Sequence, residues 1–565
     1  MRFRRSALAL RQLCDRVLPT AILHYTDVDG DIVTVRTSAG TDADLPAVAS
    51  FDASMHQLQA LFLNNKFAGT SVSITAKPGS TGGNGLVNVG YISATGTNLG
   101  AVSVHGDLGR IDAGAGTANS VAVKSLTAMS MGRFGTTTQG PFSSLLSNLH
   151  GALGSLTVHG DLDGVSIAMS GPNGKAGPVH IGGSLIGGWR TGEIRTSGAL
   201  GPVSIGGDLV GGGISLNGSV TPTGIIAAGG KLIGLTIGGS VFGGVLDGSG
   251  QVTLGTDAGP IRIAGNLVGG GGNKSGSISG LTLGMVASVS IGGSLVPGPS
   301  QSISGLLDMG NDTIGSMTVG GNLLSSITVN RSASVVVHGS IGDSTNNGYF
   351  NANTLGDVRI GGSLTGAIGA ARIASLIVGG SVHGGIWAYS SLGRLVIRGS
   401  LVNSSVSCMG PLVPDGKPSV GIGSLTVFGR VENSQIVAGY DILGVTGNAD
   451  VQIGAVTVHG DWIASDLAAG IAAGYLTNTF GDNDDSKITG GAAVDRPHSH
   501  SRIGPVVIQG QLLGTPGNAS SHGIEAEELV SLSVSGTSIH LKPGRGNDTT
   551  AIRLGAVGDV VAREF

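Results

Sequence analysis

The sequence predicts an all-β protein: a single-stranded parallel β-helix solenoid, right-handed, with a β cap at each end. The prediction rests on a motif that recurs along most of the chain, for example GPVSIGGDLV from Gly201 and SVSIGGSLVPG from Ser288. Within each copy, apolar residues alternate with others, which is the period of a β-strand, and Val and Ile predominate. The central isoleucines of three successive copies, Ile205, Ile237 and Ile263, are 32 and 26 residues apart, which fits one solenoid coil per copy.

The composition supports a repeat fold and disfavours several other classes. Of the 565 residues, 104 are glycine, 40% are hydrophobic, 12% are charged and 4% are aromatic. A chain that is this apolar and this poor in charge is not expected to be disordered, and its glycines do not recur at every third position as in collagen. A transmembrane β-barrel needs aromatic girdles, and a propeller needs longer repeats with recurrent aromatic residues, so both are disfavoured.

The N-terminal elements differ from the repeats. Residues 1–20, MRFRRSALALRQLCDRVLPT, form a basic segment that we expect to serve export or sorting, with a short amphipathic helix as the structural alternative. Residues 21–100 contain strands with polar alternation, such as TSVSITAKPGS, and are predicted to form the N-terminal β cap. A cap is expected because the end of a solenoid otherwise exposes an unpaired strand edge.

The parallel β-helix is predicted over residues 101–515, with loop insertions near 110–150 and 465–502, and residues 516–565 are predicted to hold the last coil and the C-terminal cap. In the coils, a strand of a few residues is followed by Gly-Gly and then by Ser, Asp or Asn. We expect these glycines to make tight bends through positive φ angles, and the polar residue to stabilise the bend with its own side chain. The residues expected to point inward and stack in a ladder include Val158, Ile181, Ile205, Ile237, Ile263 and Ile291.

Several stretches together resemble a family of large bacterial exported or surface-attached proteins with glycine-rich parallel β-helix repeats. They are YTDVDGDIVTVRTS, VSVHGDLGRIDAG, the IGGSL coils, GNADVQIGAVTVHGDWIASDLAAGI and the closing LGAVGDVVAREF. The segment RQLCDRVLPTA is similar to the Leu-Glu-x-Arg-x-Leu-Leu sorting motif of such proteins, although Gln12 and Cys14 stand where that motif prefers acidic residues. The resemblance implies an extracellular or cell-surface location. It brings no established activity, so no catalytic residue is carried over.

Two acidic loops are candidate calcium sites. Asp27, Asp29 and Asp31 alternate in TDVDGDIV, and oxygen ligands at the first, third and fifth positions are typical of the start of a calcium-binding loop. The acidic residue expected at the twelfth position is absent, because Ser38 stands there. Asp-Gly between alternating apolar residues also predicts a plain hairpin turn, and both interpretations stay open. The loop from Asp482 to Asp485 is the second candidate.

A ligand site is predicted on the insertion near residues 465–502, which holds the most polar segment of the chain. Loops that project from a rigid solenoid are where binding residues usually lie, and we expect that Thr477–Arg502 can be deleted without loss of the coils. Trp462 comes just before the insertion, and packing beneath the loop is its alternative role. The residues predicted to contact a ligand are Trp462, Asp482, Asp484, Asp485, His498 and His500.

The function predicted from the sequence is that of a non-enzymatic, exported or cell-surface protein, structural or adhesin-like, with polysaccharide or other cell-envelope components as partners. A net charge of −4 without a basic stripe disfavours nucleic acid, and the sequence contains no apolar run long enough for a transmembrane span. The alternative is a polysaccharide lyase or hydrolase, or a glycan-binding module. Catalysis is disfavoured because glycoside hydrolysis needs paired carboxylates, whereas the chain has only 35 acidic residues and no complete acid motif.

Overall fold

The computed structural model describes all of the chain except residues 1–19, 81, 189–191, 214–221, 281–283, 300–302, 442–443, 475–478, 490–493, 516–520 and 556–557. The export segment predicted for residues 1–20 therefore lies outside the described residues, apart from Thr20. The chain divides into two compact units, each built almost entirely from β-strands. Unit 1 consists of Met1–His159 and Met169–Gly174, and unit 2 consists of Gly160–Ala168 and Lys175–Phe565.

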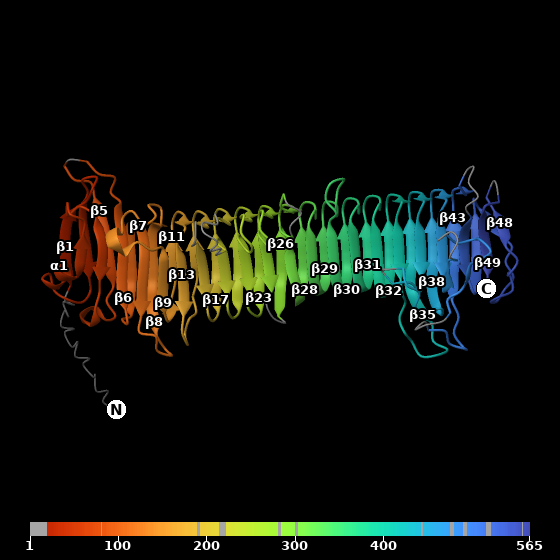
Figure 1. Cartoon of the computed structure of the whole chain (residues 1–565), viewed down its shortest axis with the longest axis horizontal. Helices are drawn as coiled ribbons and strands as arrows, with labels where there is room; N and C mark the ends of the chain where they lie inside the picture. Colours follow the sequence, from red (N-terminus) through yellow and green to blue (C-terminus); the bar gives the residue numbers. More distant parts are fainter. Residues whose placement is uncertain are drawn as a thin grey trace, which may run out of the picture. The chain divides into compact units, whose positions relative to one another are not determined.

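Unit 1 begins with antiparallel strands and continues with parallel ones (Figure 1). β1 (Ala21–Thr26) and β2 (Ile32–Thr37) form a hairpin, and β5 (Val72–Lys77) pairs with β2 in antiparallel orientation. β5 pairs in parallel with β7 (Leu99–Gly114), which pairs in parallel with β8 (Val121–Met131). The antiparallel strands thus lie where the sequence predicts the N-terminal cap.

The insertion expected near residues 110–150 is shorter than predicted. β8 and β9 (Leu146–His150) occupy much of this range, so the longest segment without strands runs from residue 132 to residue 145. Within it, the ring of Phe142 packs edge to face against Phe62 of β4 (Leu58–Phe62), with the ring centroids 5.1 Å apart. This contact holds the segment against the strands of unit 1.

Unit 2 is a stack of parallel coils, which confirms the predicted parallel β-helix. A coil carries three strand positions, for example β17 (Leu200–Ile205), then β18 (Leu209–Val210) after the Gly-Gly bend, then β19 (Ile225–Ala228). We call the surfaces that these three sets of strands form the first, second and third faces. The equivalent strands of the next coil, with which they pair in parallel, are β20 (Leu232–Ile237), β21 (Val241–Phe242) and β22 (Gln251–Leu254).

In the middle of unit 2, the third and first faces are joined by long strands that run across both. The register of β28 shows this, because its start pairs with the third face of the preceding coil and its end with the first face. These long strands are β28 (Leu307–Val319), β29 (Ser326–Val337), β30 (Tyr349–Ile360), β31 (Ala367–Val378) and β32 (Gly385–Ile397). The third face then continues with β34 (Ser405–Cys408), β37 (Gln435–Ala438), β40 (Asp466–Ala469), β45 (His522–Ala526) and β49 (Val560–Glu564).

The predicted inward ladder is confirmed. Ile181, Ile205, Ile237, Ile263 and Ile291 occupy equivalent positions on successive strands of the first face of unit 2, and each is at most 2% exposed. Val158, which belongs to unit 1, is also buried. Full burial of aliphatic side chains of this size contributes about 1.5–3 kcal/mol each, so the ladder is a main source of stability.

The Gly-Gly bends are required by the close stacking of coils, and not by positive φ angles as expected from the sequence. Gly320 has no positive φ, but a Cβ at this position would lie 2.0 Å from the carbonyl oxygen of Gly292 in the preceding coil. The polar residue after the glycines also acts between coils, because the Ser294 Oγ accepts a hydrogen bond from the N–H of Asn322, at 2.9 Å. The same ladder runs through Ser184, Asp208, Ser240, Asn266, Ser294, Asn322, Ser340, Ser363, Ser381 and Ser400.

Antiparallel strands cover the last coils of unit 2. β46 (Glu528–Val534) pairs in antiparallel orientation with β47 (Thr537–Ile539), and β49 does so with β48 (Ile552–Leu554). These hairpins lie in the segment predicted to be the C-terminal cap, and they occupy strand edges that would otherwise be free for pairing.

Candidate functional site

One column of residues on the third face of unit 2 gathers aromatic, hydroxyl and acidic side chains. The parallel register places each member of the column beside the equivalent residue of the next coil, at the spacing of about 4.8 Å between paired strands. In chain order, the column consists of Asn351, Gly369, Trp387, Ser407, Val437, Ala468, Glu525 and Arg563.

Trp387 of this column and Tyr349 of a neighbouring column form an aromatic platform. The neighbouring column runs from Tyr349 through Ala367 and Gly385 to Ser405. Both side chains are partly exposed, their ring centroids are 5.7 Å apart, and the ring planes are inclined by 33°. The indole lies across Gly369, because a Cβ at that position would be 1.9 Å from the indole Nε1. Glycine at position 369 therefore lets the ring lie close to the strand. The pair offers an apolar surface on which another ring can stack.

A cavity of about 450 Å³ adjoins the platform. Ser405 and Ser407 of β34 line it, and Ser407 is the register neighbour of Trp387. The lining continues on the next coil with Gln435 and Val437 of β37. Hydroxyl and amide groups both donate and accept hydrogen bonds, and the volume falls in the range of about 300–1,000 Å³ that is typical of ligand sites.

Tyr440 and Phe480 also line the cavity, with their ring centroids 6.4 Å apart in an edge-to-face arrangement. The Tyr440 hydroxyl donates a hydrogen bond to the carbonyl oxygen of Ile471, at 2.8 Å, and accepts one from the N–H of Ala473, at 3.2 Å. Burial raises the pKa of Tyr440 to about 12, so the hydroxyl stays protonated. This side of the cavity is therefore held in place without a ligand.

The insertion predicted near residues 465–502 begins only after β40 (Asp466–Ala469), which is a strand of the third face. The rest of it is packed into unit 2 and does not simply project from it. Phe480 is buried together with Val437 and Ala468 of the third face, and Ile488 is also buried. Removal of the insertion would uncover this apolar surface, which costs about 25 cal/mol for each Å². The packing argues against the expectation that Thr477–Arg502 can be deleted without an effect on the coils.

A buried ionic cluster lies at the end of the column, formed by Asp485, Glu525 and Arg563. Both carboxylates are fully buried, and Nη2 of Arg563 is 2.8 Å from Oε1 of Glu525 and 3.2 Å from Oδ2 of Asp485. Burial raises the pKa of Glu525 to about 9, and the neighbouring Asp485 adds to the increase. Glu525 is therefore protonated at neutral pH, so one arginine and one proton balance the two carboxyl groups.

The three acidic residues predicted on this loop, Asp482, Asp484 and Asp485, do lie together, with carboxylate oxygens within 4.8 Å of one another. Oδ2 of Asp485 accepts hydrogen bonds from the N–H groups of Gly481, at 2.7 Å, and Asp482, at 3.0 Å. Arg563 donates to the carbonyl oxygen of Asp482, at 2.7 Å. A cation in this loop would have to compete with the guanidinium group of Arg563.

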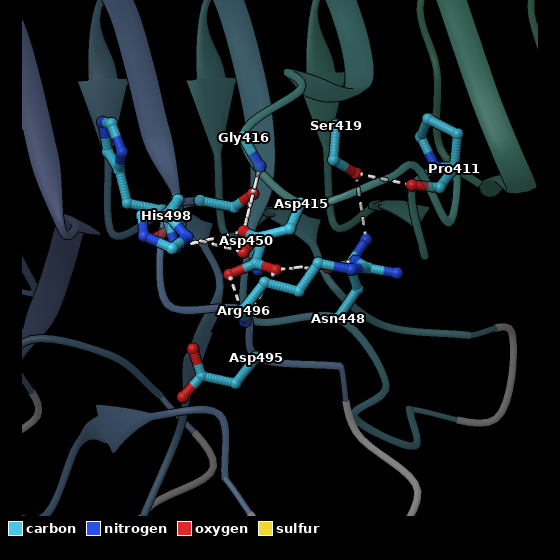
Figure 2. A network of polar contacts seen from close by, with 12 residues as sticks. Pro411, Asp415, Gly416, Ser419, Asn448, Asp450, Asp495, Arg496 and His498 are labelled. Atoms are coloured by element: carbon cyan, nitrogen blue, oxygen red, sulfur yellow. Dashed lines mark hydrogen bonds and ion pairs between the residues drawn. The ribbon is translucent and has the colours of Figure 1, made fainter.

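His498 belongs to a different polar network, which joins two loops of unit 2 (Figure 2). Its Nδ1 lies 2.8 Å from Oδ2 of Asp415, and its N–H donates to Oδ1 of the same residue, at 3.0 Å. Both hydrogen bonds lower the pKa of the Asp415 carboxyl group, and the one from the His498 side chain has the larger effect. The N–H of Gly416 donates to Oγ of Ser499, at 3.0 Å, which adds a second tie between the loops.

The same network continues inward at Arg496 and Asp450 (Figure 2). The N–H of Arg496 donates to Oδ2 of Asp450, at 3.1 Å, and burial raises the pKa of that carboxyl group. Beside it, Nδ2 of Asn448 donates to Oγ of Ser419, at 3.1 Å, and Ser419 donates to the carbonyl oxygen of Pro411, at 2.7 Å. These contacts position the loops, and we assign the network a structural role.

His500 and Trp462 make separate contacts. Nε2 of His500 lies 2.8 Å from Oε2 of Glu528. Trp462 is fully buried in the core, and its Nε1 donates to the carbonyl oxygen of Ser465, at 2.9 Å, as its alternative packing role requires. The six residues predicted to contact a ligand are thus divided between the core, the Arg563 cluster and two surface pairings.

Asp27, Asp29 and Asp31 lie in unit 1, on the turn between β1 and β2. The antiparallel pairing of these strands confirms the hairpin interpretation of the Asp-Gly sequence. The turn also brings the three carboxylates together, with oxygens within 4.8 Å of one another.

Sequence reasoning missed the platform and the cavity. Tyr349 and Trp387 are 38 residues apart and come together only because their strands belong to nearby coils. One signal was present in the sequence: aromatic residues make up only 4% of the chain, so an aromatic residue in a strand is unusual here.

Comparisons of the chain with protein-family models, with curated proteins and with solved structures found no match. The fold itself defines the class, a parallel β-helix protein, and unit 2 adds an aromatic platform and an adjoining cavity. None of the helices within the described residues has the length and apolarity needed to cross a membrane.

Proposed function

We propose that this chain is a non-enzymatic, adhesin-like β-helical protein of the cell surface or exterior, and that it binds polysaccharide on the third face of unit 2. The observation that carries the proposal is the partly exposed pair of Tyr349 and Trp387 beside a cavity lined by hydroxyl groups. A sugar ring has apolar faces and a rim of hydroxyl groups. A flat aromatic surface next to hydroxyl and amide groups complements both features.

The site is prepared for binding before a ligand arrives. Trp387 rests on Gly369, and each lies on a strand that is paired on both sides. Both Ser405, which is exposed, and Ser407, which is 9% exposed, line the cavity. From Trp387 to Val437 the column covers two coil spacings, about 10 Å, which suits a chain of sugars better than one monosaccharide.

The alternative function is that of a polysaccharide lyase or hydrolase. One observation favours it, since the raised pKa of Glu525 is the property of a general acid. Against it, the side chains of Glu525 and Asp485 are fully buried and held by Arg563, where a polysaccharide does not reach them. The acids are better explained as the support of the adjoining loop.

A glycan array with the purified full-length protein tests the proposal, followed by affinity measurements on the best ligand. Trp387→Ala is expected to weaken binding about thirtyfold, because removal of a central aromatic anchor costs about 2 kcal/mol. Gly369→Ala is expected to weaken it as well, since the new methyl group displaces the indole without removing it. Tyr389→Ala is the matched control, because Tyr389 is an exposed aromatic residue on the same strand outside the platform.

Unchanged affinity in a folded Trp387→Ala protein would refute the proposal, as would the absence of binding to any glycan. Release of reducing sugar from a bound polysaccharide by the wild-type protein, lost in Glu525→Gln, would establish the enzymatic alternative instead.

A further inference from the structure

We infer that the turn between β1 and β2 in unit 1 is a calcium-binding site, formed by the carboxylates of Asp27, Asp29 and Asp31. The inference does not depend on the proposed function, because it concerns unit 1 alone and makes no use of the third face of unit 2.

The geometry of the turn brings the ligands together before an ion is bound. The carboxylate oxygens of the three residues lie within 4.8 Å of one another, and two oxygens that share a calcium ion at 2.3–2.6 Å are at most about 5 Å apart. The N–H of Asp31 donates to Oδ1 of Asp27, at 2.8 Å, and the N–H of Asp27 donates to the carbonyl oxygen of Asp31, at 2.9 Å. These bonds fix the two ends of the turn.

Asp31 provides an independent sign of a ligand, because it is fully buried and one of its oxygens has no partner. Its Oδ2 accepts hydrogen bonds from the N–H groups of Asn84, at 3.2 Å, and Gly85, at 2.7 Å. Its Oδ1 is buried and makes no hydrogen bond among the described residues. A buried carboxylate oxygen without a partner is costly, and a bound cation removes that cost.

A second buried oxygen without a partner lies close by. The hydroxyl group of Tyr25 makes no hydrogen bond among the described residues. Tyr25 lies on β1, two residues before Asp27. The group around the turn thus contains carboxylate and hydroxyl oxygens, and a hard cation prefers such an oxygen-only set.

The charge of the cluster is not balanced by a basic side chain. In unit 1, the ion pairs of the described residues join Lys66 to Asp44 and Arg110 to Asp112, and none involves the three aspartates of the turn. The acidic loop of unit 2 differs, because Arg563 supplies a positive charge there.

Calcium fits these ligands better than magnesium does. Calcium accepts six to eight oxygens in flexible geometry, whereas magnesium requires a nearly ideal octahedron and retains most of its waters. Bound at the turn, the ion would connect residues 27–31 to the segment at Asn84 and Gly85, which precedes β6 (Val87–Thr95). Calcium would therefore stabilise the N-terminal strands of unit 1.

Calcium titration of the full-length protein after exhaustive dialysis against chelator tests the inference. Isothermal titration is expected to show calcium binding, and the melting temperature is expected to rise with calcium concentration, since a ligand of the folded state stabilises it. Asp29→Asn is expected to weaken binding at least tenfold. The side chain of Asp29 is exposed, so this variant should fold even if Asp31→Asn, which also loses backbone contacts, does not.

Asp484→Asn, in the acidic loop held by Arg563, is the matched control and should retain the wild-type affinity. The inference is overturned if the wild-type protein takes up no calcium at about 10 mM, tenfold above the weakest common affinities of calcium sites. It is also overturned if Asp29→Asn binds calcium as tightly as the wild type, or if the affinity is lost in Asp484→Asn instead.

Discussion

Replacement of Gly320 by alanine tests the conclusion that coil stacking, and not backbone conformation, requires the Gly-Gly bends. A Cβ at position 320 would lie 2.0 Å from the carbonyl oxygen of Gly292, whereas ordinary van der Waals contact begins near 3.4 Å. The oxygen belongs to the backbone of the preceding coil, so it cannot rotate away as a side chain could. We therefore expect the two coils to separate locally by more than an ångström.

The cost follows from the hydrogen bonds that this separation breaks. The N–H groups of Gly320 and Gly321 donate to the carbonyl oxygens of Ile291 and Gly293, both at 2.8 Å. The N–H of the next residue donates to Oγ of Ser294, at 2.9 Å. At about 1 kcal/mol for each bond, the loss is about 3 kcal/mol. Alanine restricts the unfolded chain and returns up to about 1 kcal/mol, so the net destabilisation is about 2 kcal/mol.

Urea denaturation followed by circular dichroism measures the stability, and hydrogen exchange locates the loss, because a solenoid can open locally around one interface. Gly310→Ala is the control, since a Cβ there would meet only Oδ1 of Asp308, at 3.8 Å. Equal stability of the two variants, with unchanged exchange of the N–H groups after Gly320, would refute the account of the bends.

Three further predictions concern unit 2. Ser294→Ala should cost about 1 kcal/mol in urea denaturation, because the N–H of Asn322 loses its acceptor, whereas Ser294→Asn should keep the bond. Ile237→Ala should destabilise the protein by about 2–5 kcal/mol, because Ile237 is fully buried in the ladder. For Glu525, burial raises the pKa from 4.5 to about 9, so the folded state keeps a proton that the unfolded chain releases. The stability due to this proton is complete below about pH 4.5 and declines as the pH rises towards 9, and Glu525→Gln should flatten the decline of the melting temperature between pH 6 and 9.

Each of these three has an outcome that contradicts it. A Ser294→Asn protein as unstable as Ser294→Ala would show that the hydrogen bond is not what matters at this position. Wild-type stability of Ile237→Ala would mean that the ladder is not the core. Parallel melting-temperature profiles of the wild type and Glu525→Gln would show that the proton on Glu525 does not contribute.

The sequence was sufficient to predict the coil framework. Strand period, Val and Ile enrichment and the spacing of Ile205, Ile237 and Ile263 are local properties of the chain, and they predicted both the parallel β-helix and its inward ladder. The hairpin at Asp27–Asp31 was predictable for the same reason, since a turn depends on its own residues. The glycines and serines of the Gly-Gly-Ser pattern were recognisable as a repeat. From the sequence alone, however, we expected them to act within the bend of a single coil and not between coils.

The tertiary structure decided which residues become neighbours across coils. Gly320 is constrained by Gly292 and Ser294 accepts from Asn322 only because the coils stack at hydrogen-bonding distance, a relation that no single copy of the motif contains. Tyr349 and Trp387 lie in different columns, and their rings meet only because the coils of β30, β31 and β32 stack in register. The partners of Asp485 are more distant still, because Arg563 follows 78 residues later. Local patterns determine which strands form, whereas the contacts that create a site depend on the register of the stacked coils and on the paths of the loops between them.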